Sequence, residues 1–147
     1  MENTEPKLHR NSPSPSVYIL VEWSLRVSLA AAFLSAVADR FGFTGAPGAP
    51  NVAWGTWQPF VDYTGTLLFF LPKALLLPAA VAATAAEVLL ALWLLTGWQT
   101  KLAAYGSALL LLTFALTMTL ALGVKAPLNY SVFTAAAAAF ALGAMKS

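Results

Sequence analysis

Four apolar stretches, each long enough to cross a bilayer, govern what this chain can fold into. They cover residues 17–40, 74–96, 100–122 and 127–145 of the 147-residue sequence. A helix of about 20 residues spans the hydrocarbon core, where a segment must satisfy all of its own backbone hydrogen bonds. The stretches therefore predict an all-α membrane protein with four transmembrane helices in one domain, residues 17–147.

The overall composition agrees with this class of protein. Hydrophobic residues make up 59% of the chain and charged residues 10%, against roughly 45–50% and 25% in soluble proteins. The formal net charge is only +2 and the basic residues are scattered, which does not favour nucleic-acid binding. The expected partner is the lipid bilayer.

The connections between the stretches predict an up-down bundle. Gly97-Trp98-Gln99 and residues 123–126 are so short that they indicate two antiparallel hairpins. The connection over residues 41–73 is long, and glycines and prolines interrupt any helix at its start. Aromatic residues and helical spacing after Pro59 then predict a short interfacial or re-entrant helix. We expect a connector lying on the membrane, with a substrate-gating lid as the alternative.

The first 16 residues are polar and contain three prolines, which predicts a disordered tail. No cleavable signal peptide is evident, because the first apolar stretch is too long and carries a glutamate and an arginine. The positive-inside rule favours cytoplasmic N- and C-termini by a small margin. In that orientation the inner basic residues are Lys7, Arg10, Lys101 and Lys146, and the outer ones are Arg40, Lys73 and Lys125.

Cysteine is absent and the single histidine is His9, in the polar tail. The chain therefore has no thiol chemistry and no residues for an iron–sulfur cluster or a covalently attached haem. We expect no metal site. A redox role would need an organic cofactor such as a quinone, or a partner subunit.

Three ionisable residues, Glu22, Arg26 and Glu87, lie inside the apolar stretches. A charge at the centre of a membrane helix costs at least about 2.5–3.5 kcal/mol, so it usually faces a partner, a cavity or a ligand. Glu22 and Arg26 share a helix face, and Glu87 lies on a stripe of alanines that favours close helix packing. Arg26 and Glu87 are each nine residues from the same predicted membrane surface, about 13 Å deep. This depth predicts an Arg26–Glu87 contact, with Glu22 one turn nearer the cytoplasm.

Two interpretations of this cluster remain open. Two carboxylates and one guanidinium would leave a net negative charge in a low dielectric, so one carboxyl group would stay protonated and exchange a proton with a ligand such as a quinone. Alternatively, the cluster is a structural clamp that fixes helix register. Lesser candidates are an ion pair between Asp39 and Arg40 at the outer mouth of the first stretch, and interhelical hydrogen bonds from Thr113 and Thr117.

Three segments carry a family resemblance. They are Leu25-Arg26-Val27 with the exit Ala38-Asp39-Arg40-Phe41-Gly42, the run from Ala86 to Gly97, and the apolar run ending near Met118. In their order and spacing the chain resembles the DoxX family of small four-helix bacterial membrane proteins. The resemblance implies an inner-membrane location, and matching positions at Arg26, Asp39, Arg40 and Glu87. It also implies association with redox systems, such as a quinone-reducing thiosulfate oxidoreductase or a complex linked to oxidative-stress defence.

The resulting functional expectation is a membrane or quinone-interacting subunit of an oxidoreductase system. Such a subunit would be non-catalytic or would bind the quinone, with Arg26 holding the head group and Glu22 or Glu87 exchanging protons. Two alternatives belong to other classes. One is a small proton-coupled transporter, and the other is a purely structural membrane partner of a redox enzyme.

Overall fold

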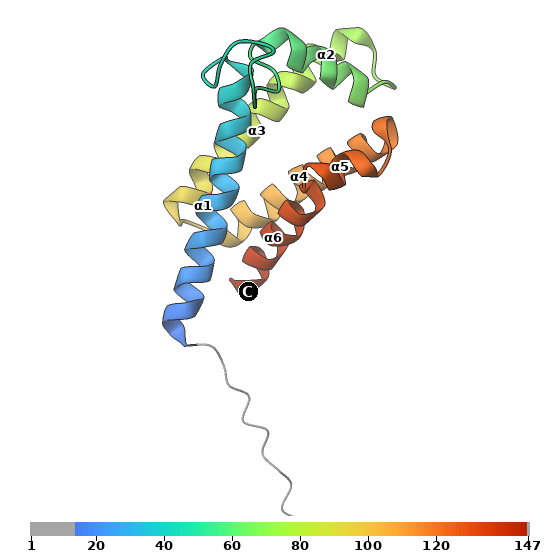
Figure 1. The fold of residues 1–147 in the computed structure, drawn as a ribbon. Helices are drawn as coiled ribbons and strands as arrows, with labels where there is room; N and C mark the ends of the chain where they lie inside the picture. Colours follow the sequence, from blue (N-terminus) through green and yellow to red (C-terminus); the bar gives the residue numbers. More distant parts are fainter. Residues whose placement is uncertain (1–13, 147) are drawn as a thin grey trace, which may run out of the picture.

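The computed structural model describes residues 14–146, and every regular element in that range is a helix. Figure 1 shows long helices that run through the molecule, with shorter helices at one end and along one side. In chain order the elements are α1 (Pro15–Arg40), α2 (Trp57–Leu67), η1 (Lys73–Leu75), α3 (Leu76–Thr96), α4 (Thr100–Leu122), α5 (Lys125–Asn129) and α6 (Val132–Met145).

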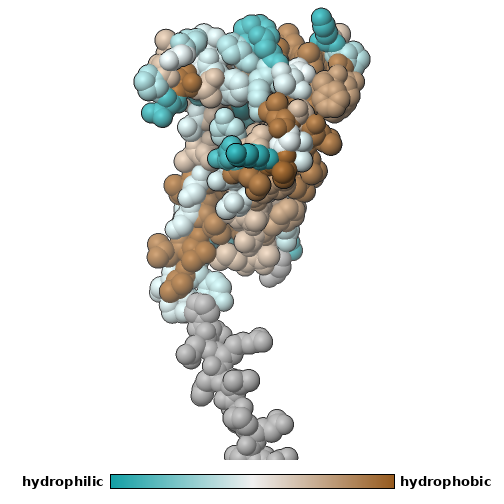
Figure 2. Space-filling model, turned by 45° about the vertical axis from the view of Figure 1, so that its right-hand side comes forward, coloured by the Kyte–Doolittle hydropathy of each residue, from teal (hydrophilic) through white to brown (hydrophobic). Residues whose placement is uncertain are grey.

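Among the described residues, three helical segments are long and apolar enough to cross a membrane: Pro15–Arg40, Lys73–Thr96 and Thr100–Leu122. Many of their large apolar side chains face outward, with Leu89 and Leu109 each 66% exposed. Figure 2 shows hydrophobic residues over much of one flank, whereas hydrophilic residues gather at the end that carries α2. A lipid-facing helix needs such an apolar exterior, so this distribution is the one expected of a multi-pass membrane protein.

The predicted fourth span, residues 127–145, differs from the structure. The chain forms the five-residue helix α5, turns at Tyr130 and Ser131, and continues as α6. Ser131 adopts a left-handed backbone with φ of 56°, which no α-helix can contain. Asn129 and Ser131 also compete for local backbone hydrogen bonds and so weaken a helix here. The 14 residues of α6 rise only about 21 Å.

α1 begins at Pro15, two residues before the predicted start. Proline is favoured in the first helical turn because its fixed φ suits a helix and its missing N–H would have no intrahelical partner. Ser14 precedes the helix with an extended backbone. The remainder of the predicted tail, residues 1–13, lies outside the described residues.

The core is made largely of alanine. Ala91, Ala103, Ala104, Ala108 and Ala139 are fully buried, together with larger side chains from the same helices. α4 packs most extensively on α6, and α1 packs on α3. Small side chains let membrane helices approach closely and gain dispersion contacts, which explains how an apolar chain in an apolar solvent still forms a defined bundle.

The long connection after α1 folds over one end of the bundle. α2 begins at Trp57, so Pro59 occupies its first turn, where its missing N–H is tolerated. α2 packs on both α3 and α4, and in Figure 1 it lies across the end of the molecule next to the C-terminal end of α1. The sequence predicted a helix in this connection; its placement at a membrane interface stays a prediction.

Candidate functional site

Two buried charges, Arg40 at the end of α1 and Glu87 in the middle of α3, lie next to each other. Arg40 Nη2 donates a hydrogen bond to Glu87 Oε1 at 2.8 Å, and Arg40 Nη1 lies 2.7 Å from Glu87 Oε2. Nη1 also donates to Thr84 Oγ1 at 2.8 Å. The two charged residues are 5% and 2% exposed. They form a buried ion pair that joins α1 to α3.

The predicted contact between Arg26 and Glu87 is therefore wrong. Arg26 lies level with the end of α3, where it contacts Leu94 and Leu95, because the first turns of α1 extend past the α3–α4 connection (Figure 1). Side chains in a helix point toward its N-terminus. The side chains of Arg40 and Glu87 consequently extend toward each other along antiparallel helices, whereas that of Arg26 extends away from Glu87.

Arg26 instead caps the C-terminus of α3. Its Nε donates to the carbonyl oxygen of Leu94 at 2.7 Å, and Nη2 donates to that of Leu95 at 3.1 Å. The last carbonyls of a helix have no intrahelical donor and carry partial negative charge, so a guanidinium suits them. Arg26 Nη1 also lies 3.5 Å from Glu22 Oε1, and Glu22 Oε2 lies 2.6 Å from Lys146 Nζ.

The expected triad is thus divided into two clusters. Glu22, Arg26 and Lys146 meet at the α3 C-terminal end of the molecule, and Arg40 and Glu87 meet toward the other end. Each carboxylate has its own cation, so the unbalanced negative charge expected of the triad does not arise. The first cluster has the geometry of a structural clamp.

Gly97 makes this clamp possible, because its left-handed φ of 75° ends α3 and an added Cβ would lie 2.8 Å from Arg26 Nη2. We expect Gly97→Ala to lower the free energy of unfolding by about 2–3 kcal/mol, from backbone strain and displacement of Arg26. Gly48→Ala is the matched control, with φ of 85° and no atom near the added Cβ; it should cost about 1–2 kcal/mol. Equal losses, measured by thermal unfolding in detergent, would contradict the close approach of Arg26.

The predicted ion pair between Asp39 and Arg40 is also absent. Consecutive helical residues point in different directions, and Asp39 faces the loop after α1. Asp39 Oδ2 accepts hydrogen bonds from the backbone N–H groups of Ala53 at 3.0 Å and Trp54 at 2.7 Å, and Oδ1 accepts one from the Thr44 hydroxyl. Asp39 thereby fixes the loop and sets the position of Trp54.

Asp39→Asn should release this loop, because asparagine keeps only one side-chain acceptor oxygen and adds a donor that faces other donors. We expect the variant to lose about 1–3 kcal/mol of stability and to speed hydrogen exchange at the amides of Ala53 and Trp54. Asp62→Asn is the matched control, since Asp62 is exposed and its carboxylate accepts a hydrogen bond only from Gln58 of the same helix. Unchanged exchange in Asp39→Asn would show that the loop is held by other contacts.

Aromatic side chains cover the ion pair. The Arg40 Cζ atom lies 3.8 Å from the centre of the Phe60 ring, a cation–π contact. Trp54 packs against Phe60 and Tyr63 with ring-centre distances of 5.6 and 4.8 Å. We call Trp54, Phe60 and Tyr63 the aromatic cap. It closes the bundle end above Arg40.

A cavity of about 760 Å³ lies beneath the aromatic cap. Arg40 and Glu87 form part of its wall, and α4 and the α5–α6 break form the opposite side. Most of the lining is apolar. Its polar members, besides the ion pair, are the indole of Trp54, the phenols of Tyr63 and Tyr130, and the hydroxyls of Thr64, Thr113 and Thr117. An apolar hollow with a few convergent polar groups is the usual form of a small-molecule site.

Two buried polar atoms in this wall have no hydrogen-bond partner: Arg40 Nε and Glu87 Oε2. Oε2 is within ion-pair distance of Arg40 but accepts no hydrogen bond. Buried polar atoms are otherwise almost always satisfied.

Burial raises the pKa of the Tyr63 phenol, and Tyr130 raises it further, so Tyr63 is protonated at neutral pH. The cavity wall therefore contains two polar atoms without hydrogen bonds and a phenol hydroxyl that can donate one.

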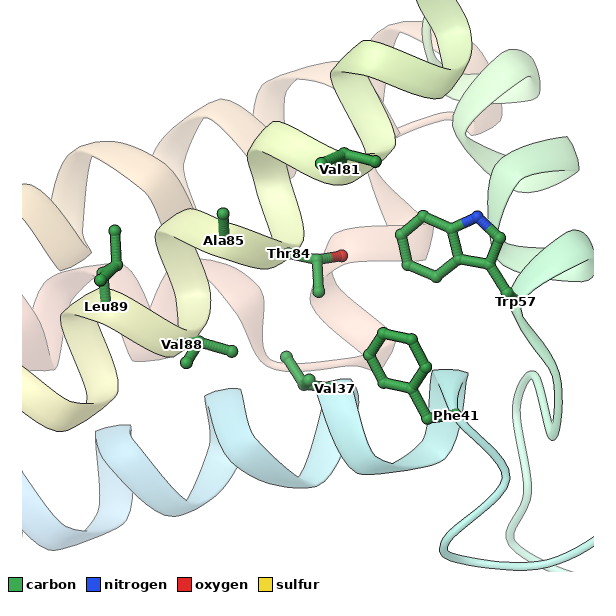
Figure 3. Close-up of a pocket in the computed structure, with 8 residues that line it drawn as sticks. All are labelled: Val37, Phe41, Trp57, Val81, Thr84, Ala85, Val88 and Leu89. Carbon is green, nitrogen blue, oxygen red and sulfur yellow. The ribbon is translucent and has the colours of Figure 1, made fainter.

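A second hollow of about 650 Å³ lies on the outer face between α1 and α3 (Figure 3). Val37 of α1 and Phe41, just after α1, line it on one side, and four apolar residues of α3 line it on the other; Trp57 stands at one end. Thr84 is the only side chain in it that bonds the ion pair. Without an ionisable group of its own, this groove is the weaker candidate.

Some residues of the site were not predicted from the sequence. Thr84 is three residues before Glu87 and so shares its helix face, a spacing that could have identified it. The sequence around Phe60 and around Tyr130 does not indicate that both residues line the same cavity, because they belong to distant segments of the chain. Thr113 and Thr117, expected to bond across helices, instead donate to carbonyls of their own helix.

Comparisons of the chain with protein-family models, with curated proteins and with solved structures find no match.

Proposed function

We propose that this protein is an integral membrane protein of DoxX type that binds a quinone in the cavity beneath the aromatic cap. It would act as the membrane or quinone-interacting subunit of a redox system. The observation that carries the proposal is the Arg40–Glu87 ion pair in the cavity wall, with Arg40 Nε and Glu87 Oε2 left without hydrogen bonds. The quinone would lie at Arg40 and not at Arg26, the position predicted from the sequence.

The residues present suit a quinone. Arg40 Nε and the Tyr63 hydroxyl are donors for oxygen atoms of a head group, and Glu87 is a carboxylate that can take up or release a proton. Phe60 and Trp54 provide aromatic faces, and Leu67, Leu110 and their neighbours provide an apolar wall for a hydrocarbon tail. A bound quinone would supply reversible two-electron, two-proton chemistry.

Electrons for such a ligand would come from a partner subunit, because the chain has no cysteine and its one histidine is His9. We place the protein in the bacterial inner membrane with both termini in the cytoplasm. The support is the thin excess of basic residues at that side and the three apolar helices. A soluble or membrane redox enzyme is the proposed partner.

A proton-coupled transporter is the second candidate, and the break between α5 and α6 favours it. Transporters place their sites beside discontinuous helices, and Tyr130 and Val132 at this break line the cavity. Uptake of a solute by proteoliposomes that collapses in Glu87→Gln would favour transport. A protein with no ligand of its own that co-purifies with a redox enzyme would favour the third candidate, a structural membrane partner.

Ala83 and Ala82 offer a matched pair of variants to test the quinone proposal. Ala83 lines the cavity, whereas its neighbour Ala82 is exposed on the same helix. A short-chain quinone analogue should raise the melting temperature of the wild type and of Ala82→Leu in detergent. Ala83→Leu should fold but show no shift, since its side chain fills the cavity. A shift of equal size in both variants, or none in the wild type, would contradict the proposal.

A further inference from the structure

We propose that the cavity beneath the aromatic cap opens sideways between α1 and α6, and that the hydrocarbon tail of its ligand leaves through this opening into the bilayer. The ligand would then be a membrane lipid with a polar head group and a long tail, only part of which lies inside the protein. This inference rests on the proposed function and names the class of quinone that the site would take.

α1 and α6 are joined at one end and separate toward the cavity. The ion pair between Glu22 and Lys146 connects the first part of α1 to the end of α6. From there the two helices diverge toward α5 (Figure 1). They pack on each other less extensively than α1 packs on α3 or α4 packs on α6. Because α6 begins only at Val132, it also does not run the full length of α1.

Small side chains border the cavity where α1 and α6 separate. Ala32 and Ala36 line it from α1, and Val132 and Ala135 line it from α6. Ala32 is exposed and the other three are partly exposed, so the cavity reaches the outside of the bundle between these helices. We call this opening the lateral slot. Its short apolar side chains leave room for a hydrocarbon chain and offer it no polar group.

The end of the cavity toward α2 is closed. Phe60 and Thr64 are buried in this roof, and Trp54 packs against Phe60 and Tyr63. Asp39 holds the loop that carries Trp54 by accepting two backbone hydrogen bonds. The roof lies at the more hydrophilic end of the molecule (Figure 2). It therefore separates the cavity from the surface at which water would enter.

The lateral slot lies along a helix long and apolar enough to cross a membrane. Ala32 is eight residues before Arg40, the last residue of α1, which is about 12 Å along the helix axis. The slot thus lies at the depth of the hydrocarbon core. Between α3 and α4 the cavity is bordered by bulkier side chains of α4: Leu110, Thr113, Phe114 and Thr117. The α1–α6 side is the less obstructed path for a tail.

The size of the cavity makes such an exit necessary for a long-tailed ligand. Its volume of about 760 Å³ suits a drug-sized molecule. A polyprenyl tail has several times as many atoms as a quinone head group, so most of it must lie outside. In the lateral slot the tail would stay in an apolar environment from the cavity to the bilayer, with no transfer of apolar surface into water.

Ala32→Phe and Ala31→Phe form a matched pair for the test. Both alanines are exposed neighbours on α1, but Ala32 lines the cavity and Ala31 does not. Each variant is titrated in detergent with two ligands that share a quinone head group, one with a methyl group and the other with a polyprenyl tail. Native mass spectrometry measures the bound fraction. Ala135→Phe provides a second obstruction from the α6 side of the slot.

We expect Ala32→Phe to weaken binding of the polyprenyl ligand by about tenfold or more, because the added ring overpacks the path of the tail. Binding of the methyl ligand should stay close to that of the wild type, since the ring does not reach the space beneath the aromatic cap. Ala135→Phe should behave in the same way. Ala31→Phe should bind both ligands as the wild type does.

The methyl ligand reports on the head-group site and the polyprenyl ligand on the lateral slot. Wild-type affinity for both ligands in Ala32→Phe and Ala135→Phe would overturn the slot and leave the quinone site standing. Equal losses for both ligands would also overturn it, as would a wild-type protein that binds only the methyl ligand. A wild-type protein that binds neither ligand would overturn the quinone site and the slot with it.

Discussion

Arg40→Leu should lower the free energy of unfolding by about 3–5 kcal/mol. The substitution leaves the Glu87 carboxylate 2% exposed without its cation, and removes the donor to Thr84. An unpaired buried charge is among the costliest defects in a folded protein. Glu87→Leu should be similarly destabilising, because it isolates the guanidinium of Arg40. Equilibrium unfolding in mixed detergent and SDS micelles measures both losses.

The double variant Arg40→Leu/Glu87→Leu should recover most of this loss. Two apolar side chains of comparable size leave no isolated charge, and such replacements are often neutral or stabilising. A double variant as unstable as the sum of the two single variants would show that the residues do not act as a pair. Arg26→Leu/Glu87→Leu is the control, since the structure pairs Arg26 with Leu94, Leu95 and Glu22 instead; its two losses should add.

Arg26→Leu is expected to cost about 2–4 kcal/mol, the second largest effect. It removes the donors to the carbonyl oxygens of Leu94 and Leu95 at the C-terminal end of α3, and leucine cannot replace them. Hydrogen exchange should quicken at the α3–α4 connection, residues 96–100, while exchange at the aromatic cap stays unchanged.

Lys101→Leu is the control for this prediction, because Lys101 is an exposed cation at the same end of the molecule. It should leave both stability and exchange close to those of the wild type. An Arg26→Leu protein as stable as Lys101→Leu would mean that the guanidinium of Arg26 does not stabilise the C-terminus of α3. Faster exchange at the aromatic cap would indicate that Arg26 acts at the cavity after all.

The long helices were predictable because length, hydropathy and glycine stops act locally. The range predicted for residues 100–122 coincides with α4, and α1 and α3 differ from their predictions by two residues at one end. The break at Ser131 was not predicted, since a single left-handed residue leaves little trace in an apolar run. Within residues 14–146, three helices are long and apolar enough to cross a membrane, so the predicted count of four is not confirmed.

The residues that form the site could be predicted only in part. Glu87 and Arg40 were both recognised as candidates, but depth counted from helix ends assigned Glu87 to Arg26. That count assumes that the helices start level, and α1 extends past the others. It also ignores the length of an arginine side chain and its direction along the helix. The cavity was beyond prediction because it joins five helices and a loop from distant parts of the sequence.

The most direct test of the central claim, that the cavity beneath the aromatic cap holds a quinone, is native mass spectrometry of protein extracted gently from membranes. Lipid extraction of the same sample identifies the bound molecule. A quinone retained by the wild type and by Ala82→Leu, and absent from Ala83→Leu, is the predicted result. A bare protein, or one that carries only phospholipid in all three, would contradict the claim and leave Arg40 and Glu87 as a structural ion pair.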